Sequence, residues 1–150
     1  METTAETTRV EREVAIAASL ETVWEFLVDP EKAVRWMGIE ATLDPQPGGR
    51  YRVVVLPGQV ASGEFVELDP PRRAVWTWGW EPGSKGTVPV GASTVAIDLE
   101  PTDSGTLVRL THALPADSAP AHGEGWEHYL SRLAVAATGA DPGADPWLSR

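Results

Sequence analysis

Six short stretches of apolar and β-branched residues follow one another between residues 39 and 113, and turn-forming residues separate each from the next. The separators are rich in proline, glycine, aspartate and serine, the residues that tight turns require. Consecutive strands joined by such turns pair in antiparallel fashion. We therefore predict an antiparallel meander whose strands span residues 39–43, 50–56, 60–68, 74–80, 93–100 and 106–113.

Helical patterns flank this meander on both sides. An alternating pattern predicts a further strand at residues 10–16, and Ser19 after it is placed to cap a helix. Asp29-Pro30 predicts a second, short helix, because aspartate is a good cap and proline is favoured at the first helical position. Apolar residues at helical spacing predict a long helix over residues 122–138.

Together these elements predict one α+β domain over residues 8–139. The end segments, residues 1–7 and 140–150, carry no periodic apolar pattern and are expected to be flexible or loosely packed tails. Trp147 lies in the second tail and leaves two alternatives open. Either it folds back onto the domain, or it is disordered with the rest of the tail.

Charge and composition exclude several classes of function. A net charge of −10 argues against nucleic acid and anionic membranes, since both attract clustered Lys and Arg. The chain has no cysteine, opens without a signal segment and contains no apolar run of about 20 residues. His122 and His128 are six residues apart, on different faces of a helix, and so do not predict a zinc site. We expect a cytoplasmic protein with no metal, no cofactor and no membrane insertion.

Several short motifs occur in order along the chain. They are VWEFL at 23–27, DPE at 29–31, GGRY at 48–51, GEF at 63–65, DPPRR at 69–73, WTW at 76–78, LTH at 110–112 and GW at 125–126. Over residues 10–147 they resemble small bacterial proteins similar to the C-terminal domain of the activator of heat-shock protein 90 (Hsp90) ATPase. These belong to the START and Bet v-like (SRPBCC) superfamily.

This resemblance implies a helix-grip fold, in which a curved antiparallel sheet of about seven strands wraps around a long C-terminal helix. Two short helices follow the first strand in that fold. The superfamily includes ligand carriers, lipid binders, polyketide cyclases and co-chaperone modules, so the shared fold does not determine the function. Full-length activators carry a separate domain ahead of the matching region, whereas nine residues precede the first predicted strand here. Direct activation of the Hsp90 ATPase is therefore not expected.

Tryptophan is unusually frequent: seven of the eleven aromatic residues are Trp. Trp76, Trp78 and Trp80 alternate along one predicted strand, so all three project from the same face of the sheet. They either form a packed aromatic layer beneath the long helix or line a cavity there. Of the three, Trp80 stands at the strand end and is expected to be the most exposed.

His112 shares strand parity with Val108 and Leu110, and is therefore predicted to face the core. An inward imidazole can be a satisfied core group, a polar anchor for a ligand, or a general acid or base near neutral pH. For the third alternative Glu64 is the nearest candidate partner, although the neighbouring Phe65 leaves the face of that strand ambiguous.

The sequence favours a binding protein over an enzyme, with a small hydrophobic or aromatic molecule held in an internal Trp-rich cavity. The protein would be a carrier, a sensor or a sequestering protein, and a monomer or homodimer. One alternative is a cyclase or hydratase that uses His112 as acid or base, and another is a chaperone-associated interaction module. No catalytic residues are assigned, and the predicted ligand-binding residues are Trp36, Tyr51, Trp76, Trp78, His112, Trp126 and Tyr129.

Overall fold

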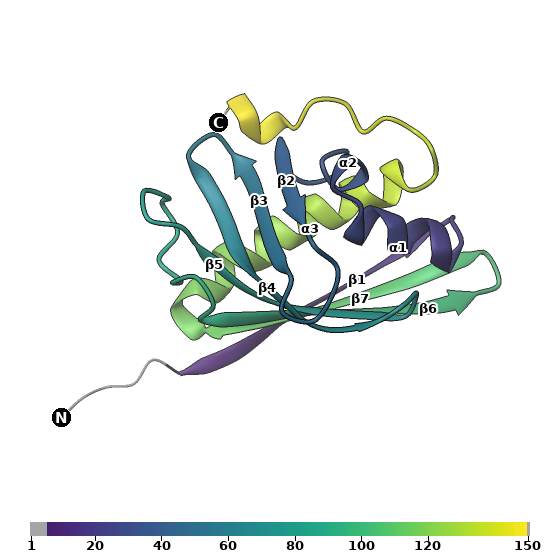
Figure 1. The fold of residues 1–150 in the computed structure, drawn as a ribbon. Coiled ribbons are helices and arrows are strands. Elements are labelled where there is room, and N and C mark those ends of the chain that lie inside the picture. Colours follow the sequence, from purple (N-terminus) through teal and green to yellow (C-terminus); the bar gives the residue numbers. More distant parts are fainter. Residues whose placement is uncertain (1–5, 150) are drawn as a thin grey trace.

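The computed structural model describes residues 6–149, and within that range it contains one seven-stranded antiparallel sheet (Figure 1). The strands lie in the order β1-β7-β6-β5-β4-β3-β2. Their bounds are β1 Thr7–Ile16, β2 Glu40–Leu43, β3 Arg50–Leu56, β4 Gln59–Asp69, β5 Arg73–Trp80, β6 Ser93–Thr102 and β7 Gly105–Pro115. The predicted meander and the additional first strand are both present.

Two short helices, α1 (Leu20–Val28) and α2 (Pro30–Ala33), follow the first strand. The side chain of Ser19 accepts a hydrogen bond from the backbone N–H of Thr22 and caps α1. Asp29 caps α2 in the same way, with its Oδ1 atom 2.9 Å from the backbone nitrogen of Glu31. Both predicted helix starts are thus confirmed.

The long helix α3 (Ala119–Ala136) crosses the concave face of the sheet (Figure 1). It begins three residues before the predicted start at residue 122, because Pro120 occupies the first turn, where its missing N–H costs nothing. A 3-10 turn, η1 (Ala116–Ser118), connects it to β7. The buried face of α3 carries Gly123, Trp126, Tyr129, Leu130, Leu133 and Ala136.

The hydrophobic core fills the space between the sheet and the helices. Strand parity is confirmed on β6 and β7, where Val95, Ile97, Val108 and Leu110 are all buried. On β4 the pairing register with β5 shifts between Phe65 and Glu67. Such an irregularity breaks the alternation of faces along a strand, which explains why sequence alone left this strand ambiguous.

The structure describes part of both predicted tails. Of the predicted N-terminal tail, residues 1–5 lie outside the described residues, and Thr7 already belongs to β1. After α3, residues 139–149, named here the C-terminal segment, run back alongside α3 (Figure 1). This segment ends in a 3-10 turn, η2 (Pro146–Ser149), near the tips of β2 and β3. In the described part of the chain, no helix is long and apolar enough to cross a membrane.

Candidate functional site

A layer of aromatic rings covers the concave face of the sheet. Trp76 and Trp78 are 1% and 3% exposed, whereas Trp80 at the strand end is only partly buried. Tyr51 on β3 stacks on Trp76, with ring centroids 4.8 Å apart and planes 16° apart. Phe65 meets the same indole edge-on at 6.1 Å. The alternation predicted for β5 thus produces a continuous aromatic surface.

His112 lies beneath this layer and is fully buried, with both ring nitrogens hydrogen-bonded. The indole Nε1–H of Trp126 donates to His112 Nδ1 at 3.0 Å. His112 Nε2 lies 2.8 Å from Ser93 Oγ, which itself donates to the backbone oxygen of Trp78 at 2.6 Å. Because Nδ1 accepts a hydrogen bond, the proton of the neutral ring resides on Nε2 and is donated to Ser93.

The electrostatics of this group follow from its burial. Desolvation, with a smaller contribution from nearby His122, lowers the pKa of His112 to about 3. The ring is therefore neutral at physiological pH and has neither a free lone pair nor a free proton. Glu64 is exposed, on the side of the sheet away from this buried ring. The structure does not bring the two groups of the acid–base alternative together.

A cavity of about 220 Å³ opens between the end of β5, α3 and the C-terminal segment. We name it the aromatic cavity. Its lining residues are Met37, Val55, Leu56, Gln59, Trp78, Trp80, Gly86, Ala121, His122, Gly125, Trp126, Tyr129 and Trp147. None of these residues is Lys, Arg, Asp or Glu, so within residues 6–149 the wall carries no permanently charged side chain. Exposed Ala121 and half-buried Gln59 and Gly86 form the side of the cavity nearest to solvent.

His122 is the one imidazole on this wall, and it is held by two neighbours. Trp80 Nε1–H donates to His122 Nε2 at 3.1 Å, and His122 Nδ1–H donates to the backbone oxygen of Ser118 at 2.8 Å. Burial lowers the pKa of His122, and the hydrogen bond to Ser118 offsets this in part. The ring therefore contributes a neutral, apolar face to the cavity.

The seven predicted ligand-binding residues fall into two groups. Trp78, Trp126 and Tyr129 lie on the wall of the aromatic cavity. The other four belong to the buried core and are not among the lining residues: Trp36, Tyr51, Trp76 and His112. For example, Trp36 Nε1–H donates to the backbone oxygen of Phe26 at 2.8 Å, which fixes it between the helices and the core.

Ten of the thirteen wall residues were not predicted as ligand-binding, and three of these ten carry aromatic rings: Trp80, His122 and Trp147. Trp80 continues the alternation of Trp76 and Trp78, and His122 precedes Trp126 by four residues, one helical turn. Those two spacings are signals that could have placed them on the wall. Trp147 has no such signal, because no periodic pattern surrounds it.

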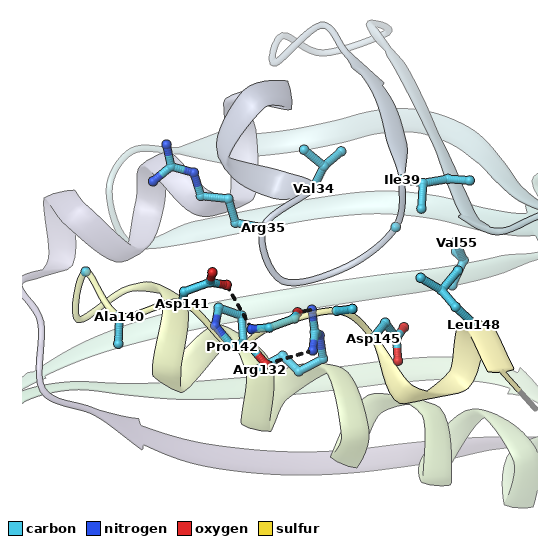
Figure 2. A pocket seen from close by; sticks show the side chains of 14 residues that line it. Val34, Arg35, Ile39, Val55, Arg132, Ala140, Asp141, Pro142, Asp145 and Leu148 are labelled. Atoms are coloured by element: carbon cyan, nitrogen blue, oxygen red, sulfur yellow. Dashed lines mark hydrogen bonds between the residues drawn. The ribbon is translucent and has the colours of Figure 1, made fainter.

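A second space, which we name the outer cleft, lies on the other side of the C-terminal segment and measures about 580 Å³ (Figure 2). Its lining includes the apolar side chains of Val34, Ile39 and Leu148. It also includes charged side chains such as Arg35, Arg132 and Asp145. Val55 lines both the outer cleft and the aromatic cavity, so the two spaces adjoin.

Comparison with known proteins establishes the relationship. The sequence matches the family model described as Activator of Hsp90 ATPase homolog 1-like protein, AHSA1, over residues 17–138. The chain belongs to the AHSA1 family. The resemblance read from the sequence motifs is thus confirmed, and the architecture described above is the helix-grip fold expected for it. No curated protein matches the sequence.

Solved structures of similar proteins agree with the AHSA1 assignment. An AHSA1-like protein from Rhizobium etli, solved by solution NMR, is 43% identical; the match covers 100% of this chain and 94% of that chain, with a TM-score of 0.76. CalU16 from Micromonospora echinospora is 29% identical over 89% of this chain and 77% of its own, with a TM-score of 0.67. A Mesorhizobium loti protein, 23% identical over 91% of this chain and 99% of its own, shares the fold with a TM-score of 0.73.

Proposed function

We propose that this AHSA1 protein binds a small, uncharged apolar or aromatic molecule in the aromatic cavity. The observation that carries the proposal is the wall itself, to which β5, α3 and the C-terminal segment all contribute aromatic rings and no permanent charge. Ligand sites in proteins are concave and mostly apolar, with few polar groups. A charged ligand would lose its hydration there without gaining a partner, so the cavity selects neutral molecules.

The size of the cavity limits the ligand. Protein interiors contain few voids larger than one water molecule, which occupies about 30 Å³. A space of about 220 Å³ holds several times that volume, yet lies below the typical ligand pockets of roughly 300 Å³ and above. We therefore expect a compact ligand, with a volume on the order of one or two fused rings.

The glycine at position 125 supports a role of the aromatic cavity in ligand binding. A glycine inside a helix costs roughly 1 kcal/mol relative to alanine. Yet nothing lies within 4 Å of the position that a Cβ atom would take at Gly125, so packing does not require the glycine. Because Gly125 lines the aromatic cavity, a side chain there would narrow it. The missing side chain keeps the cavity open at the expense of helix stability.

Two buried donors give a second sign that the aromatic layer is not built for stability alone. Within residues 6–149, the Nε1–H groups of Trp76 and Trp78 are buried without a hydrogen-bond partner. Leaving a buried donor unpaired costs about 1–3 kcal/mol. Phenylalanine would fill much of the same space without this penalty. Of the two, only Trp78 lines the aromatic cavity, and retaining an indole there fits a wall shaped to receive a ligand.

The alternative functions have less support in the geometry. An acid–base enzyme needs a titratable group within reach of the substrate, whereas both nitrogens of His112 are engaged by the protein. A docking module needs an exposed apolar patch of several hundred Å². The outer face of the sheet instead carries ion pairs such as Arg73 with Asp98 and Arg109 with Glu13. A carrier, sensor or sequestering role in the cytoplasm, as a monomer or homodimer, remains the best-supported proposal.

Binding of the neutral fluorescent probe 1-naphthylamine, which has two fused rings, tests this proposal directly. In the variant Gly125→Leu the added side chain occupies the cavity, and we expect probe affinity to fall by about tenfold or more. Ser131→Leu is the matched control, since it adds the same side chain to the exposed face of the same helix. Should Gly125→Leu fold poorly, Gly125→Ala gives the same direction of change. Equal probe affinity in the wild type and both Gly125 variants would overturn the proposal.

Native mass spectrometry of freshly purified protein gives an independent test. It detects a co-purified small molecule and the number of subunits in one measurement. We expect an adduct with the mass of a small organic molecule that is weaker or absent in Gly125→Leu. An adduct of equal intensity in both proteins would place the ligand outside the aromatic cavity.

A further inference from the structure

The C-terminal segment lies beyond residues 17–138, where the AHSA1 family model matches, yet it contributes Trp147 to the wall of the aromatic cavity. Figure 1 shows the segment in yellow, running back alongside α3. Within the described residues 139–149 no side chain is fully buried, and only Pro142, Asp145 and Trp147 are half-buried. A cavity wall formed by a segment with so little burial opens far more easily than a wall formed by the sheet.

Asp145 makes the main polar contacts between the segment and α3. Its Oδ2 atom accepts a hydrogen bond from Tyr129 Oη at 2.7 Å, and its Oδ1 atom lies 2.8 Å from His128 Nε2. Oδ1 also accepts from the backbone N–H of Trp147 at 2.9 Å. One carboxylate thus binds two consecutive side chains of the helix and orients the tryptophan that follows it.

Two further contacts complete the attachment. The ring of Trp147 stacks on His128, with centroids 4.0 Å apart and planes 7° apart. Arg132 on α3 donates to the backbone oxygens of Pro142 and Gly143 at 3.4 and 2.9 Å (Figure 2). These contacts are polar or planar and mostly part-buried, with the His128 and Asp145 side chains 18% and 11% exposed, and they can be released together while the sheet stays folded.

The segment also separates two spaces. Trp147 faces the aromatic cavity, whereas its neighbour Leu148 and nearby Asp145 line the outer cleft. Figure 2 shows Leu148 beside Val55, the residue shared by both linings. Movement of the segment would therefore join the aromatic cavity of about 220 Å³ to the outer cleft of about 580 Å³.

We propose that the C-terminal segment is the gate of the aromatic cavity, held shut by the contacts of Asp145 with Tyr129 and His128. This inference rests on the proposed ligand binding and adds how the ligand enters and leaves. Ligand passes when Asp145 releases α3 and Trp147 moves away from His128. Trp147 therefore lines the cavity and also moves when the gate opens. Asp145 is a positioning residue, because it acts by holding Trp147 in place.

Stopped-flow kinetics with 1-naphthylamine test the gate on the full chain. In Asp145→Ala we expect the association and dissociation rate constants both to rise by about fivefold or more, because opening precedes passage in each direction. Asp141→Ala is the matched control, since Asp141 Oδ1 accepts from Gly143 N at 2.8 Å within the segment. We expect its rate constants to stay within about twofold of the wild type. Unchanged rate constants in Asp145→Ala, with probe still bound, would overturn the gate.

A measurement without ligand separates failure of the gate from failure of the proposed function. Protein labelled with 5-fluorotryptophan gives a ¹⁹F signal for each indole. Opening in Asp145→Ala should shift the Trp147 signal and broaden those of Trp78 and Trp126, while buried Trp36 stays unchanged. If the wild type binds no probe but this pattern appears, the binding proposal fails and the gate stands. If the probe binds and the Trp147 signal is the same in Asp145→Ala, the gate fails alone.

Discussion

Trp126 donates its indole N–H to Nδ1 of His112 across 3.0 Å, and this contact fixes the tautomer of a fully buried imidazole. This single hydrogen bond connects α3 to β7 in the core of the protein. The other ring nitrogen of His112 donates to Ser93, and Ser93 in turn donates to the backbone oxygen of Trp78. The three hydrogen bonds therefore all run in one direction, from Trp126 to Trp78. The consequences of that arrangement can be measured.

The protein should lose stability in acid through His112. Its pKa is 6.5 in the unfolded chain and about 3 in the folded protein. Between these values the unfolded state binds more protons, so the free energy of unfolding falls as pH decreases. We expect a loss of roughly 2 kcal/mol between pH 7.5 and pH 5. Urea denaturation at each pH checks this, and His112→Gln should flatten the dependence; an unchanged slope in that variant would assign the effect to other groups.

Removing the hydroxyl of Ser93 should destabilise the fold. In Ser93→Ala the Nε2–H of His112 loses its acceptor and the backbone oxygen of Trp78 loses its donor. A buried group left unpaired costs about 1–3 kcal/mol. Thermal and urea denaturation measure this loss. Ser131→Ala, at an exposed site on α3, serves as the control and should change stability by less than about 0.5 kcal/mol.

Gly125→Ala should raise stability and weaken ligand binding at once. Alanine improves helix propensity by about 1 kcal/mol, and nothing within 4 Å obstructs its Cβ atom. The same methyl group enters the aromatic cavity. Chemical denaturation and probe titration report the two effects separately. A variant that is more stable and binds the probe as well as the wild type would contradict the role assigned to Gly125.

Arg132→Lys should loosen the C-terminal segment although the charge is kept. The guanidinium reaches the backbone oxygens of Trp36, Pro142 and Gly143 at once, whereas an ammonium group is a single point donor. Hydrogen exchange of the amides in residues 139–149 should therefore be faster in the variant. Exchange in the strands of the sheet should not change, and a uniform increase over both regions would indicate general destabilisation instead.

The sequence predicted the fold well because its strands alternate clearly. On β7 the parity of Val108, Leu110 and His112 placed an imidazole in the core, and the structure confirms it. On β4 the register shift near Phe65 hid which face was buried. A bulge of this kind is set by pairing with β5, so local alternation cannot reveal it.

The candidate site was less predictable than the fold. Periodicity identifies which side chains face inward, but not whether a given aromatic ring packs against protein or borders a cavity. Trp76 and Trp78 share one strand face, yet only Trp78 lies on the wall of the aromatic cavity. Trp147 reaches that wall through contacts of Asp145 with His128 and Tyr129, which are distant in sequence and follow no period.

The position of the C-terminal segment bears on how such proteins diversify. The sheet and α3 carry the folding core, and substitutions there are constrained by tight packing. Residues 139–149 are little buried, and they lie outside residues 17–138, where the family model matches. Substitution of Trp147 or its neighbours would change the shape of one side of the aromatic cavity, while the sequence of the core stays the same. Substitutions in this short peripheral stretch can therefore change the shape of the cavity at little risk to folding.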